Sequence, residues 1–185
     1  MGDSLLSAHA MTKKSVSDSI EAMLGEQVVD RSVPGARIVY ALPISGAMGM
    51  KIEKQFTPGD WDWVVLNGGG NDLLLGCGCV LCKTKLNRLI SYNGKYGEIP
   101  RLVSSLRRKG ARVIYVGYLR SPGLGSPIEH CKKDGDELER RIDMMAQEDD
   151  GIYYLSLQDL VPYGDRSYHG LDMIHPSVKA STEIG

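Results

Sequence analysis

Short apolar stretches typical of buried strands alternate with stretches of helical periodicity along most of this chain. Residues 61–66, 111–116 and 152–157 are the clearest strand-like runs, and residues 27–33 form a shorter one. Between them, apolar residues recur three and four positions apart, as on one face of a helix. Regular strand–helix alternation indicates an α/β fold, in which a parallel sheet carries helices on both faces.

The predicted helices carry recognisable end signals. Ser15 and Asp18 have the spacing of a capping box, and Gly25 stands where a C-terminal glycine ends a helix. The basic turn before Gly110 suits the negative end of a helix dipole, so we interpret it as a solvated helix end and not as a nucleic-acid patch. Helices are predicted over about 15–24, 82–90, 99–109 and 134–148, and another begins after Pro176.

The stretch 36–56 allows more than one interpretation. Residues 37–42 could be extended and residues 45–56 could be helical, although Gly46 and Gly49 weaken a helix. Long loops are predicted at 119–132 and 158–171.

Length and composition indicate one globular domain over residues 1–185, large enough for a real core. Hydrophobic residues make up 42% and charged residues 24%, as in ordinary globular proteins. The net charge of −1 gives no bulk electrostatic case for binding nucleic acid or a membrane surface. No apolar run approaches the roughly 18–20 residues of a membrane span, and no signal peptide is visible.

An aspartate stands three residues before a histidine near the C-terminus. At this spacing Asp172 can orient and polarise the ring of His175 on one short loop, which makes the histidine a candidate general base. A general base activates a nucleophile, and Ser4 near the other end of the chain offers a hydroxyl. We therefore predict a Ser-His-Asp mechanism with Ser4, His175 and Asp172 in the catalytic roles.

Acyl transfer to a serine also needs preorganised donors for the oxyanion. The candidate donors are the backbone N–H groups of Ser4 and Gly35 and the side-chain amide of Asn71. Glycine lets the backbone approach a ligand closely, and asparagine is a neutral donor. Each residue taken alone also fits a turn or a helix cap, so the prediction depends on their combination.

The four cysteines leave several interpretations open. Cys77, Cys79 and Cys82 crowd one loop, and Cys131 lies far away in the sequence. They could form disulfides, which would indicate an oxidising compartment, or remain free thiols. Four thiolates could instead hold zinc, but their spacing is not that of a standard zinc finger or ribbon.

The other histidines lack an acidic partner at a similar spacing. His9, His130 and His169 are therefore interpreted as structural or exposed, although His169 could line the pocket because it lies near the Asp172 loop. The chain also lacks Gly-x-Ser-x-Gly, a phosphate-binding loop and a dinucleotide fingerprint, so an α/β-hydrolase elbow and nucleotide binding are not supported.

Four segments together resemble the blocks of the SGNH/GDSL hydrolase family (GDSL-type esterases and lipases). They follow the family's order at suitable separations and cover nearly the whole chain. The segments are Gly2-Asp3-Ser4-Leu5, Asp30-Arg31-Ser32-Val33-Pro34-Gly35, Gly69-Gly70-Asn71-Asp72 and Asp172-Met173-Ile174-His175-Pro176.

The resemblance implies a three-layer α/β/α flavodoxin-like fold with a mainly parallel sheet. It implies hydrolysis of carboxylic esters or thioesters through an acyl-serine intermediate, without a metal or organic cofactor. The expected partner is a small-molecule ester such as an acyl lipid, an acyl thioester or an acetylated sugar. It gives Ser4, Asp172 and His175 the catalytic roles, and Ser4, Gly35 and Asn71 the oxyanion hole.

The sequence departs from the family pattern in two places. The second block has Asp30 where asparagine is usual and Pro34 directly before Gly35. In addition, a central strand usually precedes the Gly-Asp-Ser block, whereas only Met1 precedes it here. Without that strand its neighbours would have unpaired backbone groups. Because the chain also stops nine residues after Pro176, we expect either a domain truncated at both ends or a chain in which something else replaces the strand.

A non-catalytic module that keeps the fold and binds a carbohydrate or a protein partner is the alternative function. The complete catalytic set argues against this alternative, and the missing first strand argues for it. We expect specificity to come from residues 36–50, 77–95 and 119–132, with the cysteine loop shaping the pocket mouth. Disulfide-bonded cysteines at 77, 79, 82 and 131 would favour a periplasmic or secreted protein.

Overall fold

The computed structural model describes residues 1–123 and 125–185. Its centre is a parallel sheet in the order β1 (Trp63–Leu66), β2 (Arg112–Val116) and β3 (Ile152–Leu155). Val64 pairs with Val113, and Val113 pairs in turn with Ile152. The α/β fold class and the three clearest predicted strands are confirmed.

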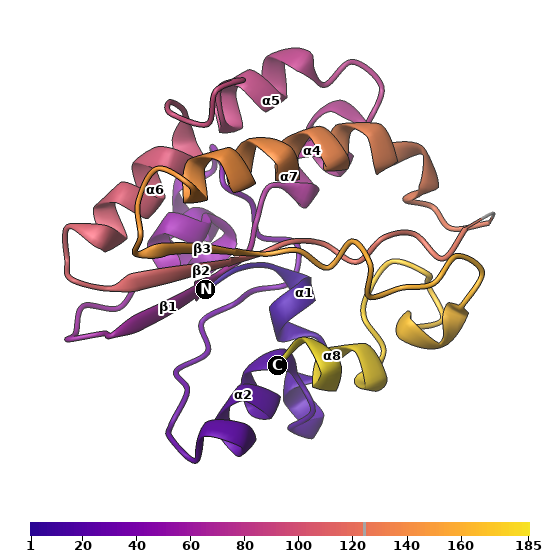
Figure 1. The fold of residues 1–185 in the computed structure, drawn as a ribbon, viewed down its shortest axis with the longest axis horizontal. Helices are drawn as coiled ribbons and strands as arrows, with labels where there is room; N and C mark the ends of the chain where they lie inside the picture. Colours follow the sequence, from indigo (N-terminus) through magenta and orange to yellow (C-terminus); the bar gives the residue numbers. More distant parts are fainter. Residues whose placement is uncertain (124) are drawn as a thin grey trace.

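Helices cover both faces of this sheet and give the molecule three layers (Figure 1). Parallel strands need crossover connections, and the helices of both crossovers cover one face of the sheet. Helices from the two ends of the chain cover the other face. One layer contains α4 (Gly70–Cys77), α5 (Lys83–Leu89), α6 (Glu98–Arg107) and α7 (Lys132–Ala146). The other contains α1 (Ser4–Ser7), α2 (Val16–Leu24) and α8 (Val178–Ile184).

Each face of the sheet has its own hydrophobic core. The core beneath α6 and α7 includes Leu106, Ile142 and Val113, and the core beneath α2 and α8 includes Val16 and Ala180. Successive side chains of a strand point to opposite faces, so the same short strands supply both cores. Burial of apolar surface on both sides therefore holds the layers together.

The end signals of α2 are confirmed. The Asp18 N–H donates to the Ser15 hydroxyl at 3.2 Å, and the Ser15 N–H donates to the Asp18 carboxylate at 2.9 Å. Gly25 ends the helix with a φ of +69°, a left-handed conformation that glycine adopts without strain.

The strand predicted at 27–33 is wrong, because residues 27–33 have no regular secondary structure. Val33 donates to the carbonyl of Gly2 at 3.0 Å, and the main chain of Met1 pairs with β1 on the other side. The N-terminal ammonium donates to the Val65 carbonyl at 2.9 Å, and the Asn67 N–H donates to the Met1 carbonyl at 3.1 Å. Residues 27–33 form no strand ladder, and the N–H groups of Val28 and Ser32 donate instead to the side chains of Glu21 and Asp30.

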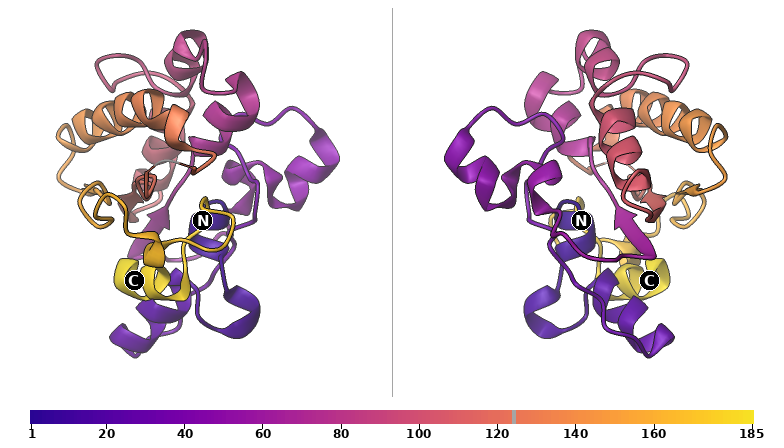
Figure 2. Two further views of the ribbon diagram at one scale, coloured as in Figure 1. Left: turned by 90° about the vertical axis from the view of Figure 1, so that its right-hand side faces the viewer. Right: turned by 90° about the vertical axis from the view of Figure 1, so that its left-hand side faces the viewer.

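The helix considered at 45–56 is broken into short pieces. These are α3 (Pro43–Ser45), the π-helical turn η2 (Gly46–Met50) and the 3-10 helix η3 (Ile52–Gln55). Gly49 has a φ of +103°, and a Cβ there would lie 2.8 Å from a methyl group of Val33. This segment projects to one side of the sheet (Figure 2).

All four cysteines are in disulfides. One bond joins Cys77 to Cys82 and the other joins Cys79 to Cys131.

No helix in the described part of the chain is long and apolar enough to cross a membrane. Within residues 1–123 and 125–185 there are also the short 3-10 helices η1 (Ala10–Thr12), η4 (Glu129–Cys131) and η5 (Arg166–Tyr168).

Candidate active site

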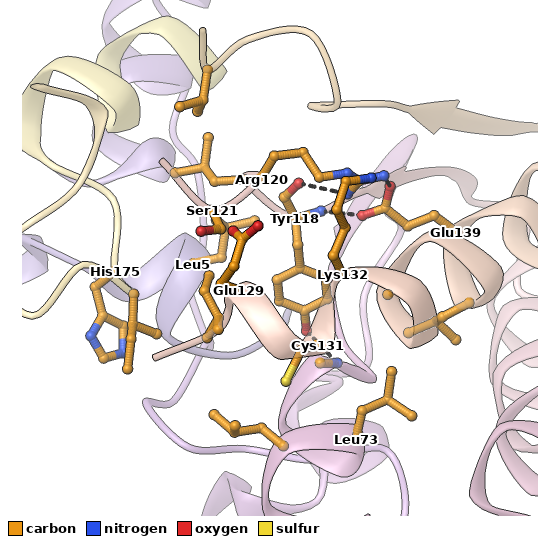
Figure 3. A pocket seen from close by; sticks show the side chains of 18 of the residues that line it. Leu5, Leu73, Tyr118, Arg120, Ser121, Glu129, Cys131, Lys132, Glu139 and His175 are labelled. Carbon is orange, nitrogen blue, oxygen red and sulfur yellow. Dashed lines mark hydrogen bonds and ion pairs between the residues drawn. The ribbon is translucent and has the colours of Figure 1, made fainter. Parts of the chain in front are cut away.

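The C-terminal ends of the strands meet a cavity of about 360 Å³. The loops after β2 and β3 lie on the right of Figure 1, the side that faces the viewer in the left panel of Figure 2. Ser4, Asn71, Tyr118 and His175 all line this cavity (Figure 3 shows Tyr118 and His175). Open α/β sheets place their sites at this edge, where side chains from distant segments converge.

Ser4 is the first residue of α1, and Asp3 caps that helix. The Leu5 N–H donates to Oδ1 of Asp3 at 2.9 Å, which fixes the turn that presents Ser4. The Ser4 N–H makes no hydrogen bond with any described residue. The turn therefore leaves both the hydroxyl and the N–H of Ser4 available to a ligand.

The carboxyl group of Asp3 is buried and ties three segments together. Its Oδ2 accepts a 2.5 Å hydrogen bond from the Tyr118 hydroxyl, which itself accepts from the Gly70 N–H at 3.0 Å. Burial raises the pKa of Asp3, and the hydrogen bonds from Leu5 and Tyr118 offset part of that rise. Burial also raises the pKa of Tyr118 well above its usual value, so this hydroxyl stays protonated and donates.

The residue before Asp3 is held by a side-chain amide. Gln55 accepts from the Gly2 N–H at 2.7 Å and donates to the Gly2 carbonyl at 2.9 Å. The same amide donates to the Gly49 carbonyl at 2.8 Å. Gln55 is almost fully buried, and its amide satisfies both backbone groups of Gly2.

Asp172 and His175 form a hydrogen-bonded pair. Nδ1 of His175 lies 2.5 Å from Oδ2 of Asp172, and the N–H groups of Ile174 and His175 each donate to Oδ1 at 3.0 Å. Partial burial works against ionisation of Asp172, but these hydrogen bonds outweigh it and lower its pKa to about 2. Nε2 of His175 makes no hydrogen bond with a described residue, and none joins the ring to Ser4.

Contacts from two other segments fix the loop that carries this pair. Nε2 of His9 lies 2.9 Å from the Pro176 carbonyl, and the Ser126 hydroxyl donates to the Met173 carbonyl at 2.8 Å. Met173 has a φ of +59°, which is unusual for a residue other than glycine. A conformation of this kind persists where the surrounding structure enforces it. We therefore infer that the contacts of His9 and Ser126 fix the backbone of the loop that carries Asp172 and His175.

The predicted oxyanion residues occupy two adjoining segments. Asn71 lines the cavity, and its side-chain amide donates to the Ala36 carbonyl at 3.1 Å. Gly35 is not among the described residues that line the cavity. Its φ is +77°, and its N–H makes no hydrogen bond with a described residue.

Asp72 anchors the segment that follows Gly35. Its two carboxylate oxygens accept from the N–H groups of Ile38 and Val39 at 2.9 and 2.8 Å. Burial raises the pKa of Asp72 to about 6, although these two hydrogen bonds and nearby cations oppose the rise. Asn71 and Asp72 together therefore determine where Gly35 lies relative to the cavity.

A comparison with protein-family models matches residues 1–181 with the GDSL-like Lipase/Acylhydrolase family. The match covers nearly all of the 185 residues. The chain belongs to this family. A comparison with curated proteins gives no match. Membership in the GDSL-like family supports hydrolysis of ester bonds in general.

The remaining histidines of this GDSL-family chain have different environments. His169 is buried but does not line the cavity, and neither ring nitrogen has a partner among the described residues. Burial lowers the pKa of His169, although the charge of Asp172 opposes this. His130 lies 3.8 Å from the sulfur of Cys131, but the two disulfides consume the thiolates that a zinc site would need.

Four polar residues that hold the GDSL-family blocks together were missed as site residues in the sequence: Asp3, Gln55, Asp72 and Tyr118. Tyr118 follows a predicted strand at the sheet edge where sites occur, which is a usable signal. Asp3 and Asp72 belong to the predicted motifs, but the sequence does not indicate that their carboxyl groups are buried. Gln55 has no local signal, because its partner Gly2 is 53 residues away.

Proposed function

We propose that this chain is a serine esterase that cleaves carboxylic esters or thioesters through an acyl-enzyme. Ser4 is the nucleophile, His175 is the general base and Asp172 orients the imidazole. The 2.5 Å pair of Asp172 and His175, beside the same cavity as Ser4, is the observation that supports this most. Asp172 remains ionised at neutral pH, so it can stabilise the imidazolium that forms during the reaction.

The proposed reaction has two half-reactions. Oγ of Ser4 bonds to the carbonyl carbon while its proton moves to Nε2 of His175. The tetrahedral intermediate then loses the alkoxide or thiolate, which takes the proton from His175, and the acyl group remains on Ser4. Water attacks the acyl-serine with His175 as base, and the carboxylic acid leaves. These steps need no metal and no organic cofactor.

The developing oxyanion needs donors that are already in place. We propose the N–H groups of Ser4 and Gly35 and the amide of Asn71 for this role. Both N–H groups lack partners among the described residues, which supports this role. The amide of Asn71 has a second N–H besides the one bound to Ala36, and that N–H is the proposed donor.

The direct test is Ser4→Ala. We expect loss of turnover of a short-chain p-nitrophenyl ester and loss of the fluorophosphonate adduct in the intact-protein mass spectrum, with an unchanged circular dichroism spectrum. Ser7→Ala is the matched control: Ser7 lies on the same helix, and its hydroxyl donates to the Asp3 carbonyl at 3.1 Å. Ser7→Ala should keep both the turnover of the ester and the fluorophosphonate adduct.

Unchanged turnover in Ser4→Ala would contradict the assignment. A folded wild-type chain that takes no adduct would instead favour the non-catalytic binding module.

We also propose an oxidising location, periplasmic or extracellular, because two disulfides are stable there. Thiol alkylation of protein isolated without reductant should find no reactive cysteine, and reactive thiols in the folded protein would contradict the location.

A further inference from the structure

The chemistry of the proposed reaction gives the cavity a direction. The leaving group takes its proton from His175, so it must lie on the His175 side of Ser4. The acyl group then extends away from His175. In Figure 3, Leu73 and Lys132 lie across the cavity from His175, with Tyr118 between them. The far part of the cavity therefore faces the acyl group.

The far part of the cavity suits an apolar group. Leu73 and Leu74 of α4, Ile128 of the loop before α7 and Leu138 of α7 all line the cavity, and Figure 3 places Leu73 in the part away from His175. Arg120, Glu139 and Lys132, three charged residues that line the cavity, are held in ion pairs. Arg120 donates to Glu139 at 2.7 Å, and Lys132 donates to Asp136 at 2.7 Å. Paired charges leave little attraction for an ionic acyl group.

The Cys79–Cys131 disulfide joins the two walls of this part of the cavity. Cys79 follows α4, Cys131 directly precedes α7, and both residues line the cavity. The bond spans 52 positions of sequence. At the other end of the contact between the helices, a methyl group of Leu138 lies 2.9 Å from where a Cβ of Gly69 would be. The disulfide thus fixes one end of the α4–α7 contact, and residues at both ends of that contact line the cavity.

The second disulfide offers a comparison within the same loop. Cys77 and Cys82 are only five positions apart, and neither is among the described residues that line the cavity. Their bond closes a local turn and joins no second wall. Cys79–Cys131 therefore joins two walls of the cavity, whereas Cys77–Cys82 does not.

We propose that the walls from α4 and α7, pinned by the Cys79–Cys131 disulfide, form an acyl-binding subsite for a hydrophobic acyl chain, and that the disulfide sets the preferred chain length. This inference rests on the proposed esterase function. A volume of about 360 Å³ is at the lower end of ligand pockets, which favours a short or medium acyl chain over a bulky one.

The experiment compares p-nitrophenyl acetate, butyrate and octanoate. For the wild type, kcat/KM should rise by up to about fourfold per buried methylene until the subsite is filled. Cys79→Ser/Cys131→Ser should lose at least tenfold more kcat/KM on octanoate than on acetate, because its walls are no longer held together. Cys77→Ser/Cys82→Ser should keep the wild-type octanoate-to-acetate ratio.

A second variant tests the subsite with both disulfides intact. Gly135 of α7 lines the cavity, and a Cβ added there meets no atom within 4 Å. Gly135→Leu fills that space and also raises helix propensity, so it should fold. We expect it to lower the octanoate-to-acetate ratio at least tenfold. If the double serine variant does not fold, this variant decides on the subsite.

The outcomes separate the inference from the function on which it rests. A wild-type Ser4 adduct together with the same chain-length profile in Cys79→Ser/Cys131→Ser and Gly135→Leu would overturn the subsite while leaving the esterase intact. Equal losses on acetate and octanoate would also overturn it, because they indicate general damage. A wild type with neither adduct nor turnover would overturn the esterase, and the subsite with it.

Discussion

Tyr118 shows how a single hydroxyl connects the proposed nucleophile to an oxyanion donor. It donates to Asp3, the residue before Ser4, and accepts from Gly70, the residue before Asn71. Catalytic groups lose much of their effect when they are displaced by about 1 Å. Tyr118 is therefore a positioning residue, since it acts on the reaction through its neighbours on both sides.

Tyr118→Phe should lower kcat by roughly ten- to a hundredfold with a smaller change in KM. It should also lower the free energy of unfolding by about 1–3 kcal/mol, because it leaves a buried acceptor and a buried donor unpaired. Steady-state kinetics and urea unfolding measure the two effects. Tyr154→Phe is the matched control, since the Tyr154 hydroxyl donates to Glu139 at 2.7 Å and touches neither Asp3 nor Gly70. Equal kcat values in both variants would contradict a positioning role.

Among the elements, the start of α4 fixes the segment that contains Gly35. Asp72 accepts two N–H groups of that segment, and its pKa of about 6 lies above the roughly 3.9 of an unfolded aspartate. The folded chain thus binds this proton more tightly than the unfolded chain. The free energy of unfolding contributed by Asp72 must then fall as the pH rises from about 4 to about 6.

Asp72→Asn should remove this pH dependence. Between about pH 4 and 6, the unfolding free energy of the wild type minus that of the variant should decline by roughly 1–3 kcal/mol, since each pKa unit is worth about 1.36 kcal/mol. Urea unfolding at several pH values measures the decline. Asp60→Asn, at an exposed position, should run parallel to the wild type. A constant difference between Asp72→Asn and the wild type would contradict the prediction.

The elements that could be predicted from the sequence are those whose determinants lie within a few residues. The Ser15 capping box and Gly25 are local, and both are confirmed. The strand predicted at 27–33 is wrong, and the stretch 45–56, which the sequence left open, forms short helical pieces. In both segments the conformation depends on distant partners. Gly49 turns beside Val33, and Gln55 binds Gly2. No pattern within either segment encodes those contacts.

The same distinction holds for the candidate site. The pairing of Asp172 with His175 follows from a three-residue spacing, and the spacing alone was enough to predict it. Ser4, Asn71 and His175 line one cavity as their motifs suggested, whereas Gly35 is not among the described lining residues. Tyr118 could not be assigned a role because its partners are 115 and 48 positions away.

For the whole molecule, the two disulfides should differ in how much they stabilise the fold. Both disulfides join segments at the ends of α4, α5 and α7, in the layer on one face of the sheet. Cross-linking removes entropy from the unfolded chain, and the effect grows with the length of the closed loop. A separation of 52 residues should therefore stabilise more than a separation of five.

The loop-entropy relation gives about 4 kcal/mol for Cys79–Cys131 and about 2 kcal/mol for Cys77–Cys82. Guanidinium unfolding should accordingly show that Cys79→Ser/Cys131→Ser loses about twice the unfolding free energy lost by Cys77→Ser/Cys82→Ser. Equal losses would mean that native-state packing, and not the unfolded chain, determines the contribution of each bond. A folded double variant with the larger stability loss but the wild-type preference for chain length would separate the two roles, leaving Cys79–Cys131 as a stabilising bond only.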